Sequence, residues 1–221
     1  MTRPGNDSYN FEPRWPVALA IATGPILLSF LPGRISPFPR WFPYVLGIAM
    51  FVPMVSVWVT NGNVLWRRLE RVALLFFFVV AGISVLLLLA DIVNVVFRGK
   101  AEIGGAQLLA SSLGLWINNL LTFSLLYWDL DRGGPEARVN NLGNKPDWLF
   151  PQDGAPGSVR SDWRPTFVDY LYLGFSTATA FSATDALPLT ARAKLLMMLE
   201  SSISLVTLVV VVSRAMNILG S

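Results

Sequence analysis

The sequence predicts an all-α polytopic membrane protein with five transmembrane helices plus a short re-entrant helix and turn. Of its 221 residues, 53% are hydrophobic and 14% are charged, and the mean hydropathy is +0.53. The apolar residues form blocks of about 20, the length that an α-helix needs to cross a bilayer. The strongest block is Val72–Phe97, and its part Val72–Ala90 offers no polar face to water. This argues against a soluble helical protein with a large apolar core.

The first two blocks, Trp15–Leu31 and Trp41–Thr60, are expected to be transmembrane helices rich in proline. Pro25 and Pro53 lie inside them and should kink or break them, since proline removes a helical hydrogen bond. Two interpretations stay open: ordinary kinked membrane helices, or a hinge that shapes a vestibule.

The third and fourth predicted spans are Val72–Phe97 and Gly104–Trp128, and a short polar connection, Asn61–Arg71, precedes them. Asp91 lies late in the third span, where an acidic side chain is costly and often functional. It could equally pair with an arginine such as Arg98.

Two adjacent amides, Asn118 and Asn119, lie within the fourth span. They are expected to hydrogen-bond to neighbouring helices, which is how polar side chains most often contribute inside a membrane. A role in an ion pathway is the alternative.

A long polar segment, Asp129–Pro165, follows and contains many Gly, Pro and Asn residues. It is too polar to cross a bilayer and too short to form a domain. We therefore expect a surface loop, with Trp148, Phe150 and Trp163 holding it on the membrane surface.

The chain ends in an unusual succession of segments. Tyr170–Thr179 is aromatic and long enough for half a span, a Ser/Thr-rich turn then ends at Asp185, and Leu195–Leu219 is apolar. Asp169 should cap the half-span helix. Irregular backbone at membrane depth is tolerated only where protein buries it or where it lines a water-filled cavity. The function is therefore expected here.

The segment Thr177–Asp185 reads TATAFSATD and aligns without a gap on the potassium-channel signature TATTVGYGD. The last fifty residues thus resemble a potassium-channel pore domain. That resemblance implies a three-span region (1–100) and a pore region (101–221). The pore region divides into an outer helix (104–128), a surface loop (129–165), a pore helix and turn (169–185) and an inner helix (189–219).

Most of the chain also resembles a bacterial family of uncharacterised integral membrane proteins, which implies a location in the cytoplasmic membrane. The matching pieces are Tyr127-Trp128, Phe150-Pro151, Asp169–Tyr172 and Ser182–Asp185. These motifs are short and spread along the chain.

The filter-like turn departs from the potassium pattern at both glycine positions, which hold Ser182 and Thr184. Each non-glycine residue forced to positive φ costs roughly 1 kcal/mol or more, so a stack of carbonyl rings is not expected. Hydroxyl groups and a carboxylate would instead form a weakly selective cation path. The candidate filter residues are Thr177, Thr179, Phe181, Ser182, Thr184 and Asp185.

Small polar residues also gather early in the last helix, at Glu200, Ser201, Ser204 and Thr207. They are expected to line a cavity behind the turn. The alternative is that Glu200 pairs with Arg192 or Lys194.

These features predict an oligomeric, cation-conducting channel in the lipid bilayer, because one re-entrant loop cannot encircle an ion. Four-fold symmetry and monovalent cations follow from the resemblance alone. Two alternatives stay open: a non-conducting membrane scaffold, and an ion-coupled transporter using Asp91 and Glu200. The chain lacks cysteine and histidine, and we find no nucleophile–base pair or phosphate loop. We expect no enzymatic activity, no cofactor or metal, and no nucleic-acid partner.

Membrane orientation is not decided by charge. Positive residues near the N-terminus and in Arg67–Arg71 favour a cytoplasmic N-terminus, whereas Arg34, Arg40, Arg98, Lys100 and Arg214 favour the opposite orientation. The channel resemblance selects a cytoplasmic C-terminus.

Overall fold

In the computed structural model of the chain, residues 15–29, 39, 41–60, 64–98, 105–140, 145–155, 157–160, 163–179 and 185–219 are described. Within them the fold is mostly helical, as the sequence predicts. The long helices are α1 (Trp15–Ser29), α2 (Phe42–Val59), α3 (Val64–Arg98), α4 (Gly105–Leu130) and α7 (Ala191–Leu219), and α6 (Phe167–Thr179) is shorter.

Two of these helices contain windows long and apolar enough to cross a membrane, by length and composition: Arg68–Leu87 in α3 and Leu109–Gly133, which begins in α4. The α3 window is only 25% buried, whereas a core helix of a soluble protein would bury most of such a window. Large apolar side chains are also exposed along α3 (Val72, Phe76, Val79, Ile83, Leu86 and Leu87) and along α7 (Leu195, Met198, Leu199, Leu205, Val206, Leu208, Val209 and Val212). These surfaces indicate association with a membrane.

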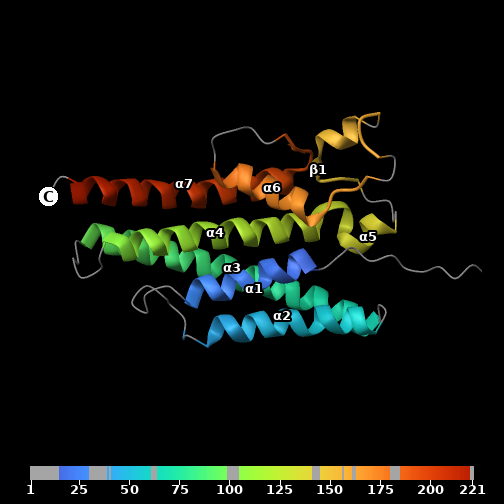
Figure 1. Cartoon of the computed structure of the whole chain (residues 1–221), viewed down its shortest axis with the longest axis horizontal. Coiled ribbons are helices and arrows are strands. Elements are labelled where there is room, and N and C mark those ends of the chain that lie inside the picture. Colours follow the sequence, from blue (N-terminus) through green and yellow to red (C-terminus); the bar gives the residue numbers. More distant parts are fainter. Residues whose placement is uncertain are drawn as a thin grey trace, which may run out of the picture.

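Helix α4 is the centre of the bundle. It packs against α6 and α7 on one side and against α1 and α3 on the other, and α2 lies outside against α1 and α3. Figure 1 shows α7 running antiparallel to α4, with α6 beside the first part of α7. Leu115, Asn119, Leu125 and Tyr127 of α4 are essentially inaccessible, as this central position requires.

Helix α3 begins at Val64. The expectation that Asn61–Arg71 is a polar connection is therefore wrong for most of that segment: Arg67–Arg71 are the first turns of a long helix. Helix α2 continues through Pro53, so this proline does not break the helix.

The segment after α4 is more structured than the predicted surface loop. It contains η1 (Asp131–Gly133), α5 (Pro135–Val139), β1 (Trp148–Leu149) and η2 (Pro151–Gly154). We call the described residues between Asp131 and Pro165 the cap. Strand β1 pairs antiparallel with β2 (Leu187–Pro188), which precedes α7, so the cap closes over one end of the bundle (Figure 1).

The aromatic residues of the cap point inward. Trp148 is 0% exposed and Phe150 is 4% exposed. The Trp148 ring lies 4.8 Å from that of Tyr127, centroid to centroid, and its indole N–H donates to the sulfur of Met197 at 3.3 Å. The expectation that Trp148 and Phe150 rest on the membrane surface is therefore wrong: Trp148 anchors the cap to α4 and α7, and Phe150 packs against Tyr170 of α6.

Candidate functional site

Helix α6 enters the bundle from the cap end and stops partway along its neighbours. Its C-terminal carbonyls are held by the two flanking helices: the Trp116 indole N–H donates to the oxygen of Ala178 at 3.3 Å, and the Ser201 hydroxyl donates to the oxygen of Thr177 at 3.2 Å. Trp116 and Ser201 both lie well inside their helices. Thirteen helical residues reach about 20 Å, which is less than the roughly 30 Å of a bilayer core.

The chain then returns to the end from which α6 started. β2 pairs with β1 of the cap, and the amide of Leu189 donates to the carbonyl oxygen of Asp147 at 2.7 Å. The described residues thus place the end of α6 between α4 and α7 and place β2 back at the cap.

The start of α6 is capped as its sequence predicts. The Asp169 carboxylate accepts the backbone N–H of Thr166 at 2.7 Å and its hydroxyl at 2.9 Å. Asp169 is the third residue of α6, so it satisfies a donor at the helix start from inside the helix, as the acidic residue of a capping box does.

The predicted filter residues are only partly covered by the structure. Phe181, Ser182 and Thr184 lie outside the described residues. The hydroxyl groups of Thr177 and Thr179 belong to α6, where they donate to the carbonyl oxygens of Leu173 and Phe175 at 2.8 and 3.0 Å.

Asp185, in contrast, is exposed. It borders a small cavity of about 80 Å³ beside the start of α6, together with residues of the cap and of the first turns of α6. The lining residues are Phe150, Pro151, Gln152, Asp169, Tyr172, Leu173, Asp185 and Ala186.

The polar residues of α7 face other helices of the same chain. Glu200, Ser204 and Thr207 are buried, and the Asn119 amide of α4 donates to the carbonyl oxygen of Glu200 at 3.2 Å and to the Ser204 hydroxyl at 3.0 Å. Ser201 bonds to α6, as described above. These polar residues, which we call the stripe, thus join α7 to α4 and α6.

Glu200 is the most enclosed member of this stripe, at 0% exposed. Its Oε2 accepts the Tyr127 hydroxyl at 2.5 Å, while its Oε1 has no hydrogen-bond partner among the described residues. Glu200 does not pair with Arg192, because that arginine binds Asp147. Tyr127 was not identified as a site residue from sequence, since only proximity in the fold links the two side chains.

The glycine at position 174 allows α6 to approach this carboxyl closely. A Cβ built on Gly174 would lie 2.3 Å from the Ser124 hydroxyl oxygen, 3.2 Å from Leu120 Cδ1 and 3.4 Å from Glu200 Oε1. Only glycine fits without a shift of these neighbours. An isolated glycine within an apolar helix is the only sequence signal for this contact.

A second buried cluster holds the cap to the bundle. Asp131 is 0% exposed, and its carboxylate accepts the Tyr170 hydroxyl at 2.5 Å and the Asp147 amide at 2.7 Å. The Arg138 guanidinium donates to the carbonyl oxygens of Trp128 and Asp131 and stacks over the Tyr170 ring at 5.0 Å.

Next to this cluster, the Asp147 carboxylate accepts hydrogen bonds from two nitrogens of Arg192 and from the Thr190 hydroxyl. The hydrogen bond from Arg192 to Asp147 raises the pKa of Arg192 above its ordinary value. Sequence reasoning treated Asp131 and Asp147 as ordinary loop residues, because nothing in their spacing marks them as buried.

The remaining predicted polar residues lie in the third and fourth predicted spans. Asn118 is buried in α4, beside Asn119. Asp91 belongs to α3, but its side chain lies outside the described residues.

Comparison with protein-family models, with curated proteins and with solved structures finds no match to this chain.

Proposed function

We propose that the chain is a five-span, homo-oligomeric membrane protein whose re-entrant element and α7 line a path for monovalent cations. The observation that carries the proposal is the course of α6, which enters from the cap end, stops against Trp116 and Ser201, and is followed by β2 back at the cap. Backbone that turns inside a membrane requires burial in protein or a water-filled cavity. A single such element cannot surround an ion, so several copies must contribute to one path.

The preference for cations rests on Asp185. The C-terminal end of a half-helix carries partial negative charge, but the carbonyl groups of Thr177 and Ala178 already accept hydrogen bonds from Ser201 and Trp116. The exposed carboxylate of Asp185 therefore supplies the negative charge in this proposal. A ring of such carboxylates around a symmetry axis would attract cations with weak selectivity.

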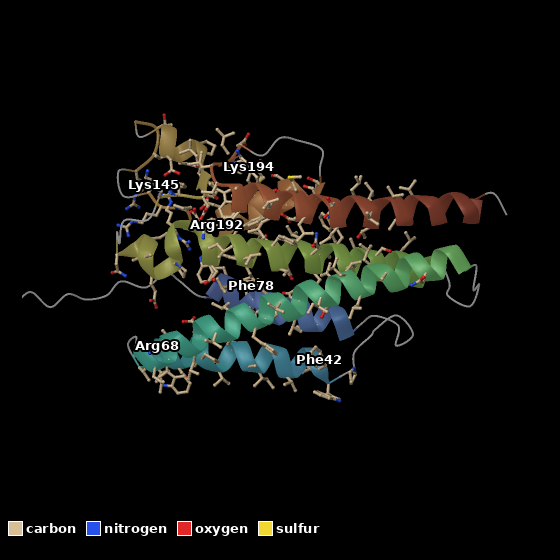
Figure 2. All side chains as sticks on the ribbon, turned by 180° about the vertical axis from the view of Figure 1, so that it is seen from behind. Phe42, Arg68, Phe78, Lys145, Arg192 and Lys194 are labelled. Atoms are coloured by element: carbon tan, nitrogen blue, oxygen red, sulfur yellow. The ribbon has the colours of Figure 1, made fainter. Side chains whose placement is uncertain are left out.

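The labelled basic residues Arg68, Lys145, Arg192 and Lys194 lie toward the end of the molecule from which α6 enters (Figure 2). The positive-inside rule favours the cytoplasm for such an end. In this arrangement the re-entrant element enters from the cytoplasmic side, opposite to the orientation that the channel resemblance implies. The chain has no cysteine, so the reaction of Lys145→Cys with a membrane-impermeant maleimide in intact cells would test the orientation directly.

The test of function is the flux of potassium and sodium into liposomes that contain the purified chain. We expect passive flux that Asp185→Asn reduces and that Asp185→Glu, which keeps the charge, largely retains. Thr179→Val should change the flux or its selectivity. Thr23→Val is the matched control, because Thr23 also donates its hydroxyl to the carbonyl four residues earlier, at 2.7 Å, but lies in α1.

Absence of flux for both ions from a folded oligomer would contradict the proposal. Uptake that saturates and depends on a second ion would instead favour an ion-coupled transporter.

A further inference from the structure

The carboxyl group of Glu200 occupies a closed position between three helices. α7 carries it, Tyr127 of α4 donates to its Oε2 at 2.5 Å, and Gly174 of α6 lies against its Oε1. Both the complete burial of Glu200 and the lack of a partner for Oε1 distinguish it from an acid in a salt bridge. This group needs a chemical explanation, because buried polar atoms normally have a hydrogen-bond partner.

The charged groups on the surrounding helices are engaged elsewhere. On α7 itself, Arg192 binds Asp147 and Lys194 is exposed. On α6, the acid of the first turn, Asp169, is bonded to Thr166.

The nearby tyrosines also have their own partners or lie at the surface. Tyr127 of α4 donates to Glu200 itself, Tyr170 of α6 donates to Asp131, and Tyr172 of α6 is exposed. Helix α3 also packs against α7 and contains Asp91, whose side chain lies outside the described residues. Among the described residues, then, no cation balances a charge on Glu200.

An ionised carboxylate in such a place loses its hydration without gaining an ion pair, which is strongly unfavourable. A protonated carboxyl group fits the same surroundings. Its proton would sit on Oε1, on the side of the carboxyl group where Gly174 of α6 lies.

We propose that Glu200 is a proton-binding site, occupied in the arrangement seen here, and that loss of its proton loosens the packing of α6 on α4 and α7. The proton leaves Oε1 for water, and the carboxylate that remains must recruit water or a cation into the contact at Gly174. Tyr127 acts as a positioning residue, since its hydroxyl fixes the orientation of the carboxyl group. The proposal goes beyond ion conduction and does not depend on it.

Proton binding can be measured by difference infrared spectroscopy of the full chain in lipid nanodiscs, from acidic to alkaline pH. We expect a carbonyl band of a protonated carboxylic acid that disappears as the pH rises and is missing from Glu200→Gln at every pH. Glu136→Gln, in the cap, should leave this band in place. Tyr127→Phe should shift the band to higher frequency, because it removes the hydrogen bond to Oε2 while keeping the carboxyl group.

Identical difference spectra for the wild type and Glu200→Gln across the pH range would overturn the proton site. Should Glu200→Gln fail to fold, an unshifted band in Tyr127→Phe would overturn it as well.

The coupling to α6 can be tested with single cysteines, since the chain has none of its own. Ala178→Cys is at a position 4% exposed near the end of α6, and Leu187→Cys is at a position 57% exposed. The same pair of cysteines in the Glu200→Gln background controls for the effect of pH on thiol chemistry. We expect the ratio of the maleimide labelling rate of Ala178→Cys to that of Leu187→Cys to rise several-fold with pH in the otherwise wild-type chain and to stay constant with Glu200→Gln. A ratio that is independent of pH in both would overturn the coupling.

Neither measurement uses ion flux, so failure of the proton site and failure of the proposed conduction would be distinguished.

Discussion

Replacing Tyr170 by phenylalanine would test whether the buried Asp131 cluster holds the cap to the bundle. The change removes the hydroxyl that donates to Asp131 Oδ2 at 2.5 Å. It keeps the ring, which packs edge-on against Phe150 at 5.3 Å and lies under the Arg138 guanidinium. The change therefore removes a hydrogen bond between the start of α6 and η1, which follows α4.

The expected loss is about 1.5–3 kcal/mol of unfolding free energy, the usual range for a hydrogen bond to a charged group. The upper part of the range applies here because Asp131 is fully buried and water cannot replace the lost donor. The measurement is equilibrium unfolding in mixed detergent micelles, followed by circular dichroism. Tyr172→Phe is a matched control: it is the same chemical change two residues along α6, at a side chain that is 57% exposed.

Tyr172→Phe should alter the unfolding free energy by no more than about 0.5 kcal/mol, as exposed substitutions usually do. If Tyr170→Phe were equally mild, the Asp131 cluster would contribute little and the reasoning from burial would be refuted.

Two further predictions concern the same three helices. Gly174→Ala should destabilise the chain by about 1–3 kcal/mol, as overpacking does, because the added Cβ would lie 2.3 Å from the Ser124 hydroxyl oxygen. Combining it with Ser124→Ala should recover part of the loss. Simple additivity of the two changes would argue against the contact. Arg192→Gln should lower the unfolding free energy by about 2–3 kcal/mol, since it leaves the carboxylate of Asp147, 1% exposed, without its cation. Lys194→Gln, at an exposed neighbour on the same helix, should be nearly neutral in the same unfolding assay. Equal effects of the two changes would contradict the role given to Asp147.

The helices could be predicted from sequence because their signals are local. Apolar blocks of about 20 residues form helices wherever they are buried or surrounded by lipid, and α1, α2, α4 and α7 begin and end within a few residues of the predicted blocks. The half-length of α6 follows in the same way from the Ser/Thr-rich segment after it. The start of α3 was misplaced because Arg67–Arg71 look like a polar connection, although charged residues are equally compatible with the exposed first turns of a helix.

The cap could not be predicted, because its signals are not local. Gly, Pro and Asn residues in Asp129–Pro165 indicate turns, but nothing in this segment shows that Trp148 will insert between Tyr127 and Met197. That position depends on the pairing of β1 with β2, about forty residues later in the chain.

The sequence by itself therefore determined a helical chain with membrane-compatible surfaces, a short helix before the last long one, and a set of unusual polar residues within apolar segments. Only the tertiary structure decided what those polar residues do. It joined Glu200 to Tyr127, Asn119 to Ser204 and Asp131 to Tyr170 across distances of 39 to 85 residues. The physical reason is that a buried polar group is stabilised by whichever partner the packing of the helices brings within hydrogen-bonding distance, and sequence spacing carries no record of that partner.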